Sequence, residues 1–420
     1  MPANLRGRAS RQDVAIAVAA AANKGGSILM GTVMAIYIGR VGSPLAVSLV
    51  TATYFLGLMV FSPVWGAIAD VTGRRRTVLV LSAALAAVAI LPLAFIGGIA
   101  VSLGLRTLFA IFAAGFLPVM LTVVSERGGD SERGRAVGLF SSAAAVGFML
   151  GQFTSGALIE LFPRSTVYLL LAGFAALVAV ACLAVEDPTH DRNRAVTFDR
   201  IARHTVSRLV PTTGMDHLRT NGLQWLYVAS FLRSVTVLGL TSLLPIYLVS
   251  NVGVSPFVMG VLLAINPAVQ MVGMYTMGLL SDRVGRKRLI ITGLVGSGGY
   301  TLLLGLTSIP DTLMGKSLVA GLGLFCLGTS FSALQTGIIS FIGDVAPTDR
   351  ESELIGLRST ARGFGGVVAP PLFGVAVMLM GFQTTFLCAT LLSWVGAALV
   401  IRFVSESHTP TGSRGVPAVE

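Results

Sequence analysis

Twelve apolar runs divide this chain, and each is long enough to cross a lipid bilayer as a helix. Such a helix needs about 20 apolar residues, because each residue advances it by about 1.5 Å and the hydrocarbon core is about 30 Å thick. Only 12% of the 420 residues are charged, whereas soluble domains carry about a quarter. The sequence therefore predicts an all-α membrane protein with 12 transmembrane helices. The runs lie at approximately 14–38, 45–67, 77–99, 104–124, 136–159, 166–185, 225–248, 256–280, 289–308, 314–342, 355–380 and 383–404.

The polar segment 186–223 separates six runs from six, so we interpret it as a linker between two domains. The predicted division is an N-terminal six-helix bundle over 1–185, the linker over 186–223, and a C-terminal six-helix bundle with a short tail over 224–420. Apolar residues recur at helical spacing from Phe198 to Leu209. This pattern predicts a short amphipathic helix on the membrane surface. A solvated linker with accidental periodicity is the alternative.

Lysines and arginines gather in the loops on one side of the predicted spans, whereas the other side holds only Arg40, Arg164 and Lys316. Basic loops stay on the cytoplasmic side of a membrane. We therefore expect a multi-pass protein of the cell membrane with both termini and the linker cytoplasmic, which also requires an even number of spans. The net charge of +11 then reflects topology, and no nucleic-acid partner is expected.

Two loops of the chain repeat each other. Residues 66–76 read Gly-Ala-Ile-Ala-Asp-Val-Thr-Gly-Arg-Arg-Arg, and residues 278–288 read Gly-Leu-Leu-Ser-Asp-Arg-Val-Gly-Arg-Lys-Arg. The shared positions, 212 residues apart, are Gly66, Asp70, Gly73 and Arg74 in the first loop and Gly278, Asp282, Gly285 and Arg286 in the second. Matching landmarks in the two halves predict a structural duplication, in which two pseudo-symmetric six-helix bundles are related by an axis along the membrane normal.

This glycine-aspartate-glycine-basic loop resembles the conserved cytoplasmic loop of the major facilitator superfamily. The resemblance covers the chain apart from its termini and linker, and it implies a twelve-helix fold that transports by alternating access. Arg106 resembles the span-four arginine that the family associates with proton coupling. The glycines of span five resemble a motif of the family's antiporters, although Gln152 stands where that motif has proline.

The repeated loops also suggest a gating role by themselves. Gly66 and Gly278 permit close helix approach, and Gly73 and Gly285 permit the positive φ of a tight turn. An aspartate beside such a turn can accept hydrogen bonds from a helix N-terminus or from an arginine. We hypothesise that Asp70 and Asp282 are latches, worth about 1 to 3 kcal/mol each, that hold the cytoplasmic side shut. The alternative is that the basic triplets serve only topology and lipid headgroups.

Basic residues occur near the middle of two spans. Lys24 lies about 15 Å into span one and Arg233 about 12 Å into span seven, at 1.5 Å per residue. Each would cost about 2.5 to 3.5 kcal/mol if it faced lipid, and all 19 acidic residues fall at span ends, in loops or in tails. We therefore expect Lys24 and Arg233 to bind an anionic substrate. The alternative is that they bond backbone carbonyls or nearby polar side chains, or that Lys24 is deprotonated by burial.

Other polar residues in the spans are candidates to line a cavity. Pro267 frees a backbone carbonyl in span eight, which is typical of a kink beside a cavity. Ordinary helix packing is the alternative for each of them. The substrate-binding candidates beside Lys24 and Arg233 are Asn23, Ser27, Tyr54, Gln152, Thr236, Asn266, Gln270 and Gln335, and Arg362 joins Arg106 as a candidate for gating or coupling.

These features favour a secondary active transporter of a small, anionic organic solute, driven by a proton gradient or by exchange. One alternative is a proton-coupled exporter of drugs or metabolites, and another is a membrane sensor that binds a solute without moving it. An enzyme is not expected, because all four histidines lie in the linker or the tail and no catalytic base or metal ligands fall within the spans. We expect a monomer in a lipid bilayer, with no cofactor and no metal.

Overall fold

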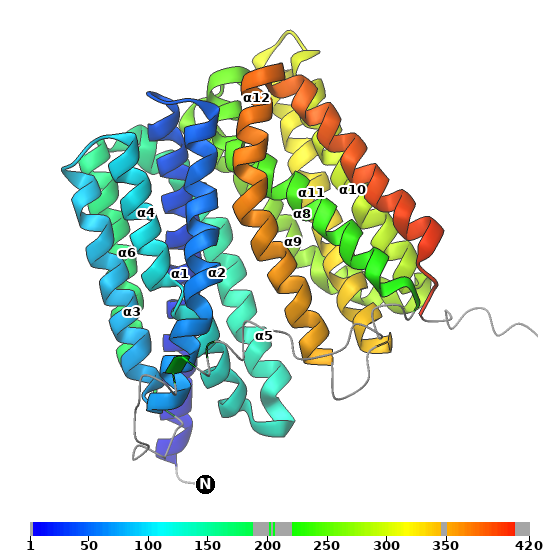
Figure 1. Cartoon of the computed structure of the whole chain (residues 1–420). Helices are drawn as coiled ribbons and strands as arrows, with labels where there is room; N and C mark the ends of the chain where they lie inside the picture. The colour runs from blue at the N-terminus through cyan, green and yellow to red at the C-terminus, as the bar shows by residue number, and fades with distance from the viewer. Residues whose placement is uncertain (1–2, 188–200, 203–204, 206–220, 346–350, 408–420) are drawn as a thin grey trace, which may run out of the picture. The chain divides into compact units, whose positions relative to one another are not determined.

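The computed structural model describes residues 3–187, 201–202, 205, 221–345 and 351–407 (Figure 1). Every regular element in these ranges is helical, and short 3₁₀ or π turns at Leu91–Ala94, Tyr247–Val252 and Leu306–Ser308 extend three of the helices. The helices are α1 (Ala3–Gly39), α2 (Pro44–Thr72), α3 (Arg75–Ile90), α4 (Ile99–Ala113), α5 (Phe116–Leu161), α6 (Arg164–Leu183), α8 (Leu223–Ile246), α9 (Pro256–Val284), α10 (Arg286–Gly305), α11 (Leu313–Val345) and α12 (Glu351–Phe403).

The described helices provide eleven stretches that are long and apolar enough to cross a membrane. The last of these, Arg358–Phe403, has 46 residues, more than twice the roughly 20 that one crossing needs. It is interrupted at Gly381, whose φ of 76° is not helical. A positive φ suits glycine, which has no Cβ to clash with the backbone. Gly381 therefore divides α12 into two crossings, in agreement with the predicted fold of 12 transmembrane helices.

The boundaries of the third, fourth and fifth crossings differ from those of the predicted runs. The third predicted run, 77–99, ends early, because α3 stops at Ile90 and a 3₁₀ turn containing Pro92 follows. Proline lacks the backbone N–H that a continuing α-helix requires. The fourth crossing then begins at Ile99 and continues through α4 into α5 as far as Arg127, and the fifth occupies Glu132–Leu161. A long α5 thus contains parts of two crossings.

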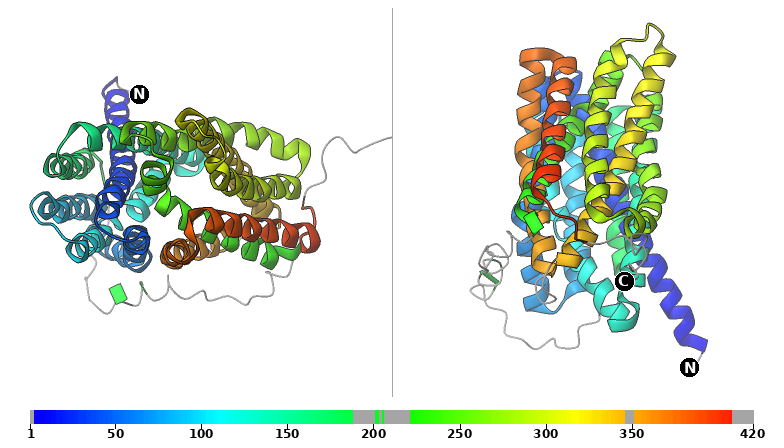
Figure 2. Two further views of the ribbon diagram at one scale, coloured as in Figure 1. Left: turned by 90° about the horizontal axis from the view of Figure 1, so that it is seen from above. Right: turned by 90° about the vertical axis from the view of Figure 1, so that its right-hand side faces the viewer.

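The chain divides into two compact units. Unit 1 comprises residues 1–212 with 255–264, and unit 2 comprises 213–254 with 265–420. Within each unit the helices lie side by side (Figure 2). The core of unit 1 includes Leu79 of α3 and Met120 of α5, and the core of unit 2 includes Leu294 of α10 and Phe341 of α11. The predicted domain boundaries at 185 and 224 stay a prediction.

Glycines allow α5 to pack closely on α1 within unit 1. A Cβ on Gly147 would lie 2.1 Å from the Ala21 carbonyl oxygen, and one on Gly151 would lie 2.5 Å from the Gly25 carbonyl oxygen. No side chain fits such spaces, and small residues permit this backbone approach in membrane helices. The glycine-rich pattern of span five therefore has a packing explanation.

The first residues of α9 belong to unit 1, where they pack on the end of α5. A Cβ on Gly156 would lie 2.1 Å from the Pro256 carbonyl oxygen. The rings of Phe153 and Phe257 are 6.0 Å apart, and Glu160 accepts a hydrogen bond of 2.9 Å from the Phe257 N–H. A carboxylate is favourable at a helix N-terminus, because the first N–H groups have no partner inside the helix.

The amphipathic helix predicted in the linker falls almost entirely outside the described residues. Ile201, Ala202 and Thr205 are helical, and the Thr205 hydroxyl donates to the Ile201 carbonyl at 2.9 Å. Phe198, Leu209 and Pro211 lie outside the described ranges. The surface helix stays a prediction.

Candidate functional site

Arg106 is a buried cation within a crossing of unit 1. It lies on α4 with 3% of its surface exposed. Its guanidinium lies 4.4 Å from the centre of the Tyr54 ring and 5.3 Å from that of Phe109, and Nη2 donates to the Ser27 carbonyl at 3.4 Å. Nε and Nη1 have no hydrogen-bond partner among the described residues. Two aromatic rings and one carbonyl thus compensate this charge only in part.

Of the polar residues predicted on α1, Ser27 contacts this arginine, and Asn23 and Lys24 lie elsewhere on the helix. Asn23 and Ser27 line a pocket of unit 1 together with Phe109 and Ser82. Lys24 is exposed, with its ammonium 5.4 Å from the centre of the Phe148 ring. Among the predicted residues, the structure therefore brings Ser27, Tyr54 and Arg106 together.

Gln152 of α5 contacts α1 at Thr32, further along α1 than Ser27. Its side-chain oxygen accepts a hydrogen bond of 3.1 Å from the Thr32 hydroxyl. This bond joins α5 to α1 beside the glycine contacts of the same two helices.

Arg233 is a buried cation within a crossing of unit 2. It lies on α8 with 7% of its surface exposed. Nε donates to the Ser297 hydroxyl at 3.2 Å, and the guanidinium lies 5.3 Å from the centre of the Phe331 ring. Nη2 has no hydrogen-bond partner among the described residues. A buried guanidinium nitrogen without a partner is costly. Arg233 also lines a pocket, whereas Arg106 lines neither of the two described pockets, so Arg233 is the stronger candidate to bind a ligand.

Two further arginines line the same pocket as Arg233. Arg358 and Arg362 are four residues apart on α12, so their side chains share one face of the helix. Arg362 lies 5.9 Å from the centre of the same Phe331 ring, and Arg358 donates to the side-chain oxygen of Gln335. The described residues that line this pocket include no aspartate or glutamate. They are Tyr227, Ser230, Phe231, Arg233, Ser234, Phe331, Leu334, Ile338, Arg358, Ala361 and Arg362.

The remaining predicted polar residues of unit 2 bond to one another or to the framework. The Thr236 hydroxyl pairs with Ser393 at 3.0 Å and donates to the Arg233 carbonyl at 2.9 Å. Gln270 donates to Asn266 at 2.8 Å within α9. Thr236 is completely buried, so its hydroxyl stabilises the contact between α8 and α12.

The loop between α2 and α3 forms an ion-pair cluster in unit 1. Gly73 has φ 60° and ends α2. Arg75, the first residue of α3, pairs with Glu126 and lies 3.9 Å from Asp70. Arg74 is exposed. The residue that joins the loop to another helix is thus Arg75, and not Arg74, which the sequence had indicated.

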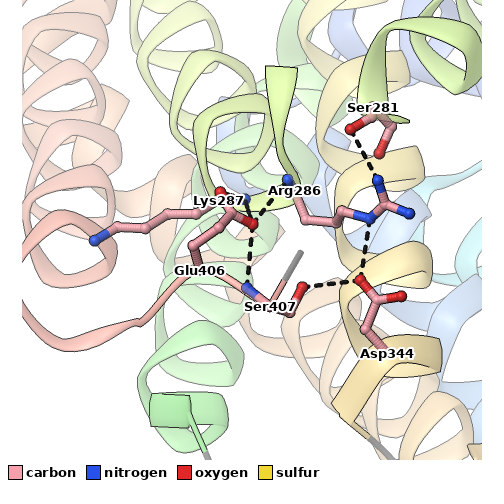
Figure 3. A network of polar contacts seen from close by, with 6 residues as sticks. All are labelled: Ser281, Arg286, Lys287, Asp344, Glu406 and Ser407. Carbon is pink, nitrogen blue, oxygen red and sulfur yellow. Dashed lines mark hydrogen bonds and ion pairs between the residues drawn. The ribbon is translucent and has the colours of Figure 1, made fainter. Parts of the chain in front are cut away.

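A larger network surrounds the start of α10 in unit 2 (Figure 3). Arg286 donates from Nε to Asp344 at 3.0 Å and from Nη1 to the Ser281 carbonyl at 2.9 Å. Glu406 accepts from the backbone N–H of Arg286 at 3.0 Å and from that of Lys287 at 3.2 Å. The segment after α12 therefore caps the N-terminus of α10, and its next residue, Ser407, donates to Asp344 at 3.0 Å.

The family model of the Major Facilitator Superfamily matches residues 16–370 and 226–418, which together include nearly the whole chain. The chain belongs to this superfamily. It is 26% identical over 339 residues to the multi-drug resistance efflux pump PmrA of Streptococcus pneumoniae, covering 79% of each chain. It is 25% identical to the multidrug resistance protein MdtG of Citrobacter koseri, covering 81% of this chain and 80% of that one.

Solved structures agree with the fold of this superfamily member. A crystal structure of a D-xylose-proton symporter matches with a TM-score of 0.74 at 13% identity, covering 94% of this chain and 98% of that one. The protein is therefore a multi-span membrane protein of a transporter family.

The two loops of this superfamily member differ by one residue in register. Arg75 and Arg286 each begin the third long helix of their half, and each pairs with an acid at the end of another crossing, Glu126 or Asp344. They are 211 residues apart, so the sequence repeat of 212 aligned Arg286 with Arg74 instead. Sequence reasoning also missed the acids. The sequence feature that could have indicated Glu126 and Asp344 is their position just after the predicted spans four and ten.

The remaining gating candidates have mixed outcomes. Gly285 has φ 98°, as a tight turn before α10 requires. Gly66 is buried, but a Cβ on Gly278 would meet no described atom within 4 Å, so the close approach expected there is not present. The side chain of Asp282 lies outside the described residues.

Proposed function

We propose that this protein is a secondary active transporter that moves a small organic anion across the cell membrane by alternating access. The observation that carries the proposal is the Arg233 guanidinium, which is buried in α8 and has one nitrogen without a partner among the described residues. The driving force is a proton gradient or exchange of solutes. The termini and the linker face the cytoplasm.

The anionic character of the substrate follows from the charges in the pocket around Arg233. Three arginines line it, and its described lining contains no acid. A guanidinium at the centre of a membrane costs about 2.5 to 3.5 kcal/mol when lipid surrounds it. A bound carboxylate or phosphate would offset this cost through charge-assisted hydrogen bonds.

Lys24 remains a proposed second anion-binding residue. It lies near the middle of the Arg11–Gly39 span, and its ammonium is over the Phe148 ring. Asn23 and Ser27, on the same stretch of α1, line the pocket of unit 1. We assign Arg106, together with Tyr54, to coupling, because this partly compensated charge is suited to respond to protonation or to ligand binding.

The two loop clusters are proposed to act as gates. Asp70 and Arg286 belong to networks that hold the ends of several helices together. Breaking such a network would favour the conformation in which those ends separate. Asp70→Asn should therefore shift the population from the outward-open state, in which the cytoplasmic side is shut, toward the inward-open state. Unchanged accessibility of engineered cysteines on both membrane faces would contradict this role.

Export of drug-like compounds is the second candidate function. It is favoured by the similarity to PmrA and MdtG, which are named as multidrug efflux or resistance proteins. Cationic drugs would need an acidic partner, and none lines either of the two described pockets. Anionic or neutral compounds fit this candidate better.

A thermal-shift screen of the purified protein tests the proposal. The ligands are organic acids, phosphate esters and amphipathic cations, applied to the parent, Arg233→Gln and Lys24→Gln. We expect anions to stabilise the parent and to lose this effect in Arg233→Gln. Stabilisation by cations alone, or equal stabilisation of parent and variant by anions, would overturn the anion assignment. Accumulation of the ligand in sealed vesicles then distinguishes a transporter from a sensor.

A further inference from the structure

We propose that the pocket of unit 2 selects organic anions that carry at least two negative charges on a planar carbon skeleton. Arg233, Arg358 and Arg362 are the residues that bind these charges. This inference rests on the proposed function, because it specifies the substrate class of the same site. It adds Arg358 to the candidate substrate-binding residues and moves Arg362 from gating to binding.

The number of guanidiniums sets the charge of the ligand. Arg233 comes from α8, and Arg358 and Arg362 come from adjacent turns of α12, so the three positive groups enter the pocket from two helices. One carboxylate has two oxygens and pairs fully with one guanidinium. Arg233 is buried, Arg358 is half-buried and Arg362 is exposed toward the pocket side of α12. A monoanion would therefore leave two like charges close together without an anionic partner. A dianion or trianion compensates them.

The neighbours of the arginines orient them toward a common space. Phe331 lies under both Arg233 and Arg362, at 5.3 and 5.9 Å from the ring centre. Gln335, one turn further along α11, accepts a hydrogen bond from Arg358. Ser297 holds Nε of Arg233 at 3.2 Å. A single helix, α11, thus places two of its side chains against all three arginines, which limits the directions in which they can turn away.

The rest of the lining favours an organic frame over an inorganic ion. Tyr227, Phe231 and Phe331 provide aromatic surface, and Leu334 and Ile338 provide aliphatic surface. Inorganic phosphate or sulfate would leave this surface without a partner, whereas a flat carbon skeleton would bury it. Ser234 adds a hydroxyl on α8 that can donate to a ligand oxygen, whereas the hydroxyl of Ser230 already donates to the Leu226 carbonyl at 2.7 Å.

A series of ligands with one frame and increasing charge tests the inference. Benzoate, isophthalate and benzene-1,3,5-tricarboxylate carry one, two and three carboxylates on the same ring. Their dissociation constants are measured by isothermal titration calorimetry on the detergent-solubilised full-length protein. We expect isophthalate to bind about tenfold or more tightly than benzoate, since each additional charge-assisted contact adds of the order of 1.5 to 3 kcal/mol, and the tricarboxylate to bind at least as tightly as isophthalate.

Variants identify the residues responsible. The double variant with Arg358→Gln and Arg362→Gln should reduce the preference for isophthalate over benzoate to about threefold or less, because only the Arg233 guanidinium is then left. The double variant with Arg358→Lys and Arg362→Lys, which keeps both charges, should retain most of it. Arg402→Gln is the control, because Arg402 is an exposed arginine of α12 outside the pocket, and it should bind as the parent does. An unchanged elution volume in size-exclusion chromatography shows that each variant is folded.

The outcomes separate this inference from the proposed function. Equal affinity of the parent for benzoate and isophthalate would overturn the inference, while loss of anion binding in Arg233→Gln would still support an anion transporter. A preference for isophthalate that persists in the double glutamine variant would also overturn it. If no organic anion bound the parent, the proposed function and the inference would both fail.

Discussion

At the scale of single residues, neighbouring arginines of one loop have different roles. Arg75 is buried at the start of α3 and pairs with Glu126 and Asp70, whereas Arg74 is exposed. Three consecutive arginines look equivalent in the sequence. Because α3 begins at Arg75, the side chain of this arginine, and not that of its neighbours, contacts Asp70 and Glu126.

Arg75→Gln should therefore destabilise the protein, and Arg74→Gln should not. Removing Arg75 breaks its ion pairs with Glu126 and Asp70, whose side chains are 45% and 29% exposed, so the cost is about 1 kcal/mol. Thermal unfolding in detergent measures the difference, with Arg74→Gln as the matched control. Equal melting temperatures for the two variants would show that the ion pairs contribute nothing to stability.

At the scale of elements, the last described residues act as a cap for a helix in the middle of the chain. Glu406 accepts hydrogen bonds from two N–H groups at the start of α10. In unit 1, Asp187, which follows α6, accepts a bond of 3.4 Å from the N–H of Arg76 in α3. Each half thus uses a carboxylate that follows its sixth predicted span to cap its third helix.

Glu406→Gln should lower stability by about 1 kcal/mol, because an amide keeps one acceptor but loses the favourable interaction of a negative charge with the helix N-terminus. Glu186→Gln is the control, since Glu186 is exposed beside Asp187. Urea or heat unfolding of both variants in the same detergent measures the effect. A Glu406→Gln variant as stable as the control would mean that the cap is dispensable.

The contact between α1 and α5 predicts a position-specific effect of adding one methyl group. Gly147→Ala places a Cβ against the Ala21 carbonyl, and overpacking of this kind costs typically 1 to 3 kcal/mol. Gly138→Ala on the same helix meets nothing within 4 Å and should be neutral or slightly stabilising. Comparison of melting temperatures tests the pair. A tolerated Gly147→Ala would contradict the close packing of the two backbones.

The crossings were predictable from the sequence because a bilayer accepts few backbone structures. Without water every backbone N–H and C=O must bond internally, so a long apolar run must become a helix. The junctions were less predictable. The predicted separation of the runs 355–380 and 383–404 is confirmed by the break at Gly381. The third crossing, however, ends at a turn containing Pro92, earlier than its apolar run, which continues through Phe95 and Ile96.

The candidate site was predictable only in part, because charge in a span is visible in the sequence but the direction of a side chain is not. Arg233 stands out as a cation in an apolar run, and the structure places it in a pocket. Arg358 lies near a predicted span end, where a long side chain can reach the membrane surface. Its place beside Arg233 depends on how α12 packs on α8, which no local pattern records.

At the scale of the whole molecule, the protein is a twelve-helix member of the Major Facilitator Superfamily, and the crossings of each unit contain a buried arginine with at least one unpartnered nitrogen among the described residues. The cation of unit 1, Arg106, is covered by aromatic rings and by the Ser27 carbonyl. The cation of unit 2, Arg233, shares its pocket with two more arginines. Only the second arrangement calls for several negative charges from outside the protein.

Transport by Arg233→Gln is the most direct test of anion transport. Parent and variant are reconstituted at equal amounts into proteoliposomes, and the measured quantity is the protein-dependent flux of the anion that stabilises the parent most. The account predicts that Arg233→Gln lowers this flux at least tenfold, the effect of losing about 1.4 kcal/mol of binding, and that Arg402→Gln leaves it unchanged. Equal flux through the parent and Arg233→Gln would contradict the account.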